Sequence, residues 1–116
     1  MKIYVSHASS FDYRAELYAP LQAHLTEHEL FLPHEKTNDA IDTKEALKNS
    51  DLIVAEVSYT STGQGIELGW ANDADVPIVC IHRHNTKPSS ALKIVSNKFI
   101  SYSSDNDLIE KLQEIL

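Results

Sequence analysis

The stretch Asp51–Trp70 constrains the fold of this chain more than any other. It reads DLIVAEVSYTSTGQGIELGW, with an apolar run (Leu52–Val57), a polar turn rich in small residues (Ser58–Gly65) and a helical pattern that carries Glu67. This order is typical of a buried parallel strand that leads through a loop into a helix. Because ligands of open α/β sheets bind outside the carboxyl ends of such strands, we place the candidate active site here.

Short apolar runs alternate with helical patterns along the rest of the chain. The predicted strands are 2–6, 29–32, 52–57, 78–81 and 98–102. The predicted helices are 12–27, 43–49, a third that starts near 62–65 and ends at about 73, and 105–116, with a short helical turn at 90–95. Pro20 predicts a kink or break in the first helix, and Asp42 is the expected N-cap of the second, with Glu45 as its capping-box partner. The alternation predicts an α/β fold: a three-layer, doubly wound, five-stranded parallel sheet in a flavodoxin-like order.

The bulk properties narrow the class of protein. The 116 residues suffice for one domain with a real core, so residues 1–116 are predicted to form a single domain. No apolar run approaches the roughly 20 residues that cross a bilayer. No secretory or transit signal is evident at the N-terminus, and we expect a cytoplasmic protein without a membrane partner. Cys80 is the single cysteine and lies in an apolar run, which indicates a buried thiol rather than a disulfide.

Charge and motifs exclude further classes. The formal net charge of −7, without a cluster of Lys or Arg, disfavours binding to a nucleic-acid polymer but not to a mononucleotide. The chain contains no GxGxxG after its first strand, no GxxxxGK[ST] and no GxSxG. Dinucleotide-dependent redox, P-loop and α/β-hydrolase chemistry are therefore not indicated, and no cofactor is expected.

Two glutamates of the central stretch are candidates for chemistry. Glu67 is expected in the first turn of its helix, where the helix N-terminus favours a negative charge; it can act as a nucleophile or simply stabilise the helix. Glu56 is an acid within an apolar strand, which indicates either a ligand contact or a paired, buried carboxylate that braces loops.

The six histidines are scattered and predict no metal site. His24 and His28 have the spacing of a helical pair, but they lie near a solvated helix end without an adjacent acid. His7 and His34 follow strands one and two, so each can line the pocket or hydrogen-bond its own loop.

These residues resemble a known family. The pattern DLIVAEVSYTSTGQGIELGWA is similar to the nucleoside 2-deoxyribosyltransferase superfamily, nearest its 2′-deoxynucleoside 5′-monophosphate N-glycosidase branch. The resemblance extends to KIYVS with its small-residue loop, ELY in the first helix, the histidine after strand two, PIVCIHR and SSALK. It implies an enzyme that cleaves or transfers the N-glycosidic bond of a nucleoside or nucleoside 5′-monophosphate through a glutamate nucleophile and a glycosyl-enzyme intermediate.

The resemblance also implies roles for single residues. Glu67 corresponds to the nucleophile, Tyr4 to a tyrosine near it, and Ser90 to a phosphate ligand that reaches across a homodimer. Asp42 is the candidate for a second catalytic acid. The remaining positions expected to contact the substrate are Ser6, His7, His34, Ser58, Ser61, Gly63 and Gly65, of which the two glycines would shape the loop under the sugar.

The chain also departs from the family pattern. Thr43 stands at the position of the family's second catalytic aspartate. Asp42 is the residue before it, but a shift of one position along a helix turns a side chain by about 100° around the helix axis. Ser9 and Ser10 occupy the loop that holds a phosphate-binding arginine in the monophosphate hydrolases, and His7 replaces a glycine.

Two other functions stay open at this stage. IYVSHASSFD resembles the opening box of TIR domains, which predicts an NAD-cleaving or protein-interaction module, although the GQGIELGWA loop favours the first interpretation. A non-catalytic nucleotide-binding protein is the third possibility. Trp70 is expected either in the core or as an anchor of a homodimer interface.

Overall fold

Parallel strands form one twisted sheet in the computed structural model, which describes residues 1–39 and 42–116. The strands are β1 (Lys2–His7), β2 (Glu29–Phe31), β3 (Leu52–Glu56), β4 (Ile78–Arg83) and β5 (Lys98–Tyr102). Their order across the sheet is β2-β1-β3-β4-β5, and every neighbouring pair is parallel. The predicted five-stranded, flavodoxin-like α/β fold is thereby confirmed.

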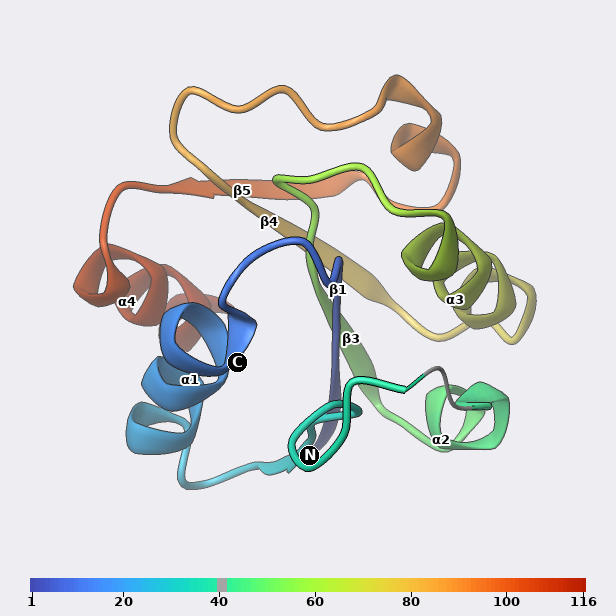
Figure 1. The fold of residues 1–116 in the computed structure, drawn as a ribbon, viewed down its shortest axis with the longest axis horizontal. Coiled ribbons are helices and arrows are strands. Elements are labelled where there is room, and N and C mark those ends of the chain that lie inside the picture. Colours follow the sequence, from blue (N-terminus) through green and yellow to red (C-terminus); the bar gives the residue numbers. More distant parts are fainter. Residues whose placement is uncertain (40–41) are drawn as a thin grey trace.

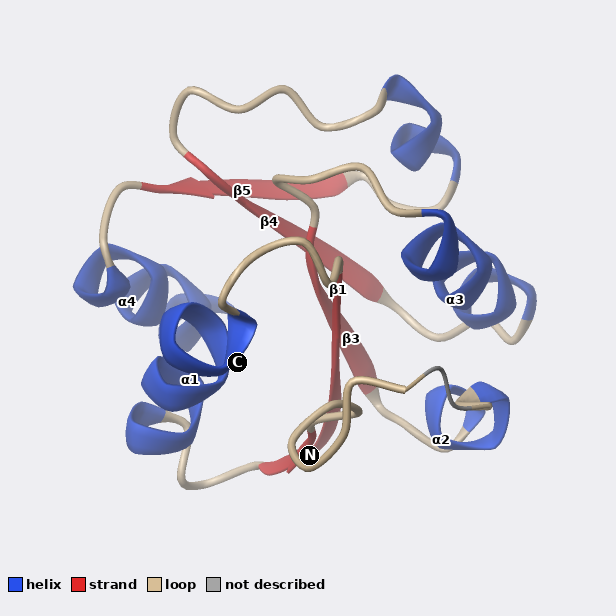
Figure 2. Cartoon of the chain, viewed as in Figure 1, coloured by secondary structure: helices blue, strands red, loops and turns tan. Residues whose placement is uncertain are grey.

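Helices cover both faces of this sheet (Figures 1 and 2). They are the π-helical η1 (Arg14–Tyr18), α1 (Ala19–His24), α2 (Lys44–Lys48), α3 (Thr62–Asp73), the 3-10 helix η2 (Ser90–Ile94) and α4 (Asp105–Ile115). In Figure 1, α1 and α4 lie to the left of the sheet and α2 and α3 to the right. This is the three-layer arrangement expected when parallel strands are joined by helical crossovers.

Alternation along β1 divides its side chains between two cores. Ile3 and Val5 pack with η1, α1 and α4, whereas Tyr4 packs with α2 and α3. Successive side chains of a strand point to opposite faces, so Ser6 shares the face of Tyr4 and the ring of His7 lies on the other. Because β1 is central in the sheet, its carboxyl end can present side chains to both faces.

The predicted element boundaries hold within a few residues, with two instructive differences. The first helix is interrupted as expected near Pro20, where π-helical η1 gives way to α1, and it ends at His24 rather than at 27. The π-helical turn accommodates the proline: the backbone N–H of Ala19 bonds to the carbonyl of Arg14, five residues earlier, and Pro20, which has no N–H, follows where α-helical bonding resumes. Helix α2 begins at Lys44 with Thr43 as its N-cap, so the prediction that Asp42 is the N-cap was wrong.

Two further expectations concern burial. Cys80 is a free, fully buried thiol, and burial raises its pKa. Within residues 1–39 and 42–116, no helix is long and apolar enough to span a membrane.

Candidate active site

Glu67 lines a cavity of about 370 Å³ at the carboxyl end of β1. Helix α3, which carries it, begins at Thr62, and the hydroxyl of Ser61 caps the helix by accepting a hydrogen bond of 3.3 Å from the backbone N–H of Gln64. Glu67 therefore lies in the second turn, not in the first as predicted, because the helix starts before both glycines of the GQG segment. The helix N-terminus acts mainly on the first turn, so other groups must stabilise this carboxylate.

Three hydroxyl groups surround the Glu67 carboxylate. Tyr4 donates a hydrogen bond to Oε2, and Thr43 donates to the same oxygen at 2.7 Å. Ser6 donates to Oε1 at 3.0 Å. An ionised carboxylate only accepts hydrogen bonds, so all three hydroxyls can donate to it at once. These contacts fix the orientation of the carboxylate while one edge remains on the cavity.

Tyr4 is the most firmly held of the three donors. Its side chain is fully buried, and its ring stacks on Phe31 with a centroid distance of 5.1 Å. Burial, together with the negative charge of Glu67, raises the pKa of Tyr4 well above its usual range. Tyr4 therefore keeps its proton at neutral pH and remains a donor to Glu67.

The structure places Thr43, not Asp42, next to Glu67. Thr43 is buried and lines the cavity, whereas Asp42 is exposed and its carboxylate accepts a hydrogen bond of 3.1 Å from the backbone N–H of Lys44. The expected substitution of the second acid by Asp42 is not seen in this geometry, because the step of one residue along the chain turns the Asp42 side chain toward solvent. The sequence had pointed to Thr43 only through its position eight residues before Asp51, where the resembled family has its second catalytic aspartate.

His7 and His34 form another wall of the cavity. Nδ1 of His7 lies 2.7 Å from the carbonyl oxygen of Ala8, which can only accept, so this nitrogen carries the proton. Its Nε2 then accepts a hydrogen bond of 2.5 Å from the hydroxyl of Tyr18, which in turn accepts one of 3.0 Å from the backbone N–H of His34. Burial lowers the pKa of His7 from 6.5 to about 4, so its ring is neutral at physiological pH.

Asn38 is a cavity residue that the sequence did not single out. Its Oδ1 accepts hydrogen bonds from the hydroxyl of Tyr13 at 2.6 Å and from Nη2 of Arg14 at 2.9 Å. These two donors fix the amide with its oxygen toward Arg14, which leaves the NH₂ group as a donor for a ligand. Short loops without regular periodicity give no sequence signal for such a contact, because it depends on where η1 lies.

The other predicted contact residues divide into two groups. Ser61 and Gly63 line the cavity, but Gly63 and Gly65 belong to helix α3 and not to a loop. A Cβ added at either glycine would meet nothing within 4 Å, so no contact inside the chain requires glycine there. Ser58 instead accepts a hydrogen bond of 2.8 Å from the backbone N–H of Arg83, and Ser90 is an exposed residue at the start of η2.

Glu56 is a buried and satisfied carboxylate. It is fully buried, and its oxygens accept hydrogen bonds from the backbone N–H of Ser58, at 2.6 Å, and from the hydroxyl of Tyr102. This favours the structural interpretation of Glu56, since Oε2 joins the end of β3 to Tyr102 of β5 and Oε1 fixes the turn that follows β3.

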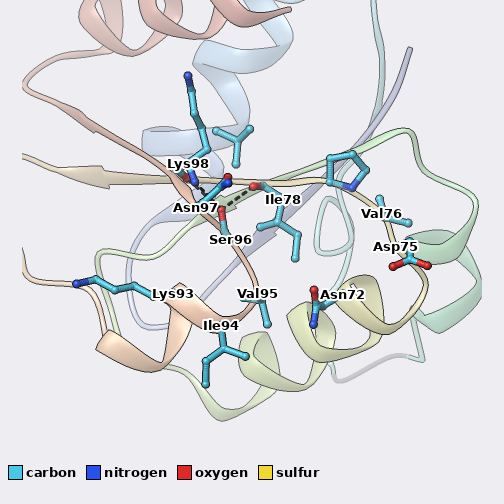
Figure 3. Close-up of a pocket in the computed structure, with 12 residues that line it drawn as sticks. Asn72, Asp75, Val76, Ile78, Lys93, Ile94, Val95, Ser96, Asn97 and Lys98 are labelled. Carbon is cyan, nitrogen blue, oxygen red and sulfur yellow. Dashed lines mark hydrogen bonds between the residues drawn. The ribbon is translucent and has the colours of Figure 1, made fainter.

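A second, larger cavity of about 530 Å³ lies at the other end of the sheet, near the starts of β4 and β5 (Figure 3). Ser96 donates a hydrogen bond of 2.7 Å to the carbonyl oxygen of Ile78 and accepts one of 3.1 Å from the backbone N–H of Lys98. Both atoms of its hydroxyl are therefore engaged in holding the two strands. Ile94 at its rim is 80% exposed.

Comparison with known proteins adds an independent view. No family model matches the chain. A Syntrophotalea carbinolica protein named as a 2′-deoxynucleoside 5′-phosphate N-hydrolase 1 is 33% identical over 73 residues, which cover 60% of this chain and 51% of that protein. The chain thus spans about half the length of this curated relative.

Solved structures agree on the fold. The CMP N-glycosidase of Clostridium botulinum superimposes with a TM-score of 0.74 at 20% identity, covering 100% of both chains. A conserved protein from Enterococcus faecalis V583 gives a TM-score of 0.67 at 20% identity, covering 100% of this chain and 99% of that one. Both superpositions establish the fold that this chain shares with these proteins.

Most of the residues that line the cavity belong to two segments that the sequence had marked, the end of β1 and the start of α3. Sequence reasoning did not single out Asn38, Gln64 and Ile66, which also line the cavity, and it had noted Ser9 only as a departure from the family's phosphate-binding arginine. Trp70, which was expected either in the core or at a homodimer interface, is half-buried and also lines the cavity. Across residues 1–39 and 42–116, no group of three or more His, Cys, Asp or Glu is arranged to hold a metal ion.

Proposed function

We propose that this protein hydrolyses the N-glycosidic bond of a nucleotide, with Glu67 as the nucleophile. The observation that supports this most is the Glu67 carboxylate, which lines a cavity at the carboxyl end of a central strand and is oriented by Tyr4, Ser6 and Thr43. The names of the relatives, a deoxynucleoside phosphate N-hydrolase and a CMP N-glycosidase, agree with the proposal.

The reaction follows the course of a retaining glycosidase. An oxygen of Glu67 attacks C1′ of the sugar, the C1′–N bond breaks, and the base departs with the bonding electrons. Water then attacks C1′ of the glycosyl ester, which breaks the C1′–O bond to Glu67 and regenerates the carboxylate. One hydrogen of the water stays on the new C1′ hydroxyl of the sugar, and its other proton goes through solvent to the departed base. The hydroxyls of Tyr4, Ser6 and Thr43 hold the carboxylate in one orientation, so little entropy is lost when it meets C1′.

The other cavity residues are assigned by their position. His7, His34 and the NH₂ group of Asn38 form the wall that would contact the base or sugar, and Ser61 lies at the start of α3. Ser90 lies outside the cavity of its own chain, so its role as a phosphate ligand would require a homodimer in which a second copy supplies it.

Release of free base from a panel of nucleosides and 5′-monophosphates tests the proposal. The wild-type chain should release base from at least one of them, and Glu67→Gln should lower kcat/KM by at least about 1,000-fold, because the amide is not a nucleophile. A matched control is Asp75→Asn at the second cavity, where the residue has a left-handed φ of 58° that asparagine tolerates equally well. Base release that survives Glu67→Gln would remove Glu67 as the nucleophile.

Transfer and sensing are separate outcomes of the same assay. Recovery of a new nucleoside when a second free base is added would indicate transfer instead of hydrolysis. Tight nucleotide binding without release of any base would favour the non-catalytic alternative.

A further inference from the structure

The cavity lacks the second acid that N-glycoside cleavage ordinarily uses. Retaining glycosidases pair a nucleophilic carboxylate with a carboxylic acid that protonates the departing group. Of the described residues that line this cavity, Glu67 alone is an Asp or Glu. Asp12 lines only the adjoining hollow that shares Ser9 and Asn38, and Asp42 faces solvent. A leaving base would therefore find no carboxylic acid beside it.

The hydroxyls around Glu67 cannot take over this role. Tyr4 keeps its proton because burial and the Glu67 charge raise its pKa. Thr43 and Ser6 are alcohols, which are far weaker acids than a carboxyl group, and both already donate to Glu67. All three protons point to the nucleophile and not into the space where a base would depart.

The two histidines also lack a proton for the base in their neutral forms. Both ring nitrogens of His7 are engaged, one with Ala8 and one with Tyr18. Nδ1 of His34 lies 3.1 Å from the carbonyl oxygen of Thr37, so in the neutral ring this nitrogen carries the proton and Nε2 has only a lone pair. His34 could donate from Nε2 solely as an imidazolium.

We propose that the substrate class of this site is N-glycosides whose base is already positively charged, such as pyridinium ribosides or N7-alkylated purine nucleotides. The inference rests on the proposed function. When the C1′–N bond breaks, its electron pair returns to the cationic ring, which leaves as a neutral molecule without a proton. Glu67 forms the C1′–O bond; water then displaces it at C1′, and the surplus proton of the water goes to solvent. The products are the neutral base, the sugar bearing a hydroxyl at C1′, and one proton.

The charge and surface of the cavity suit such a ring. Glu67 is the one side chain of the Asp, Glu, Lys and Arg types among the described residues that line it, and the lowered pKa of His7 keeps that ring neutral at physiological pH. Trp70 offers an aromatic wall to the cavity. Aromatic faces attract cationic rings.

The test compares 7-methylguanosine 5′-monophosphate with guanosine 5′-monophosphate, which differ by one methyl group and one charge. We take kcat/KM for base release from the cationic nucleotide, divide it by kcat/KM for the neutral one, and then divide this ratio by the same ratio of the uncatalysed rates, which gives the normalised ratio. A general acid would accelerate base release from the neutral nucleotide alone, by about 100- to 10,000-fold, and would lower the normalised ratio by the same factor. We expect a normalised ratio of 1 or more; a value below about 0.01 would overturn the inference.

Two variants sharpen the result. Thr43→Asp adds a carboxyl group beside Glu67, where two carboxylates in close contact favour protonation of one. It should raise kcat/KM for the neutral substrate at least about tenfold and leave the cationic one no faster, whereas Thr43→Ser should keep the wild-type ratio. If the Thr43→Asp variant does not fold, the normalised ratio of the wild-type protein still tests the inference.

His34→Gln identifies the competing explanation. If the neutral substrate is cleaved well and His34→Gln selectively removes that activity, His34 is the acid and the inference is wrong. The proposed function fails in a different way, by release of no base from either nucleotide or by release that survives Glu67→Gln.

Discussion

Two cavities of this molecule lie at opposite ends of the parallel sheet and differ in chemistry. The one at the carboxyl end of β1 is smaller, about 370 Å³ against about 530 Å³, yet it holds Glu67 with three hydroxyl donors. In the larger one, the buried hydroxyl of Ser96 is used to join β4 to β5. Size is therefore a poor guide to the site, and the direction of the strands is a better one.

The physical reason is the geometry of the crossovers. At the carboxyl ends of the strands, loops lead on to helices, so side chains from the end of β1 and from α3 can converge on one point with His34, Asn38 and Thr43. Ligand-binding groups are often placed on loops that a rigid sheet positions. The following predictions test whether the two cavities differ in function as they do in chemistry.

Acidification should have the largest effect on stability. The pKa of His7 is about 4 in the folded chain against an ordinary 6.5, so the unfolded chain binds more protons between these values. The free energy of unfolding should therefore fall as the pH drops from about 7 toward 4, by up to about 3 kcal/mol. Urea unfolding across this range should show a smaller loss in His7→Gln, which cannot be protonated.

The control for this prediction is His24→Gln, because His24 is exposed on α1. That variant should keep the pH dependence of the wild-type chain. A His7→Gln protein whose stability falls with pH as steeply as that of the wild type would show that other groups are responsible.

Tyr4→Phe should have a large effect on activity. It removes one of the donors to Oε2 of Glu67 but keeps the ring that stacks on Phe31. A loosely positioned nucleophile loses about 100-fold in rate, so kcat/KM for base release should fall by about that factor. Circular dichroism should show an intact fold; unchanged kinetics would mean that Thr43 and Ser6 suffice to orient the carboxylate.

Two buried serines, one at each cavity, provide a matched comparison. Ser96→Ala leaves the carbonyl of Ile78 without its donor and should lower the free energy of unfolding by about 1 to 2 kcal/mol, with kcat/KM unchanged. Ser6→Ala removes the donor to Oε1 of Glu67 and should lower kcat/KM by about tenfold. Loss of base release in Ser96→Ala at a temperature where it is fully folded would contradict the contrast between the cavities.

Ile94→Gln should have the smallest effect. This side chain is 80% exposed at the rim of the second cavity, so the free energy of unfolding should change by no more than about 0.5 kcal/mol. Base release should equal that of the wild type. A clear loss of activity would show that the second cavity takes part in the reaction.

The fold was largely predictable from the sequence, and so was the segment that carries the site. The apolar run of β3 followed by the GQGIELG helix indicated both a parallel strand and the position of Glu67. Periodicity encodes such local features directly, since burial on both faces demands continuous apolar residues. The register of the helix was misjudged by about one turn, because the N-cap at Ser61, and not the glycines, fixes its start.

What the sequence alone determined is therefore the order of the elements, the direction of the strands and the carboxylate at their exit. Only the tertiary structure decided which side chains meet that carboxylate. In the folded chain, Thr43 and not Asp42 contacts Glu67, and Tyr4 and Ser6 donate hydrogen bonds to the same carboxylate. Asn38 and the two histidines line the cavity beside it. These contacts join residues up to 63 positions apart, and such long-range packing leaves no periodic trace in the chain.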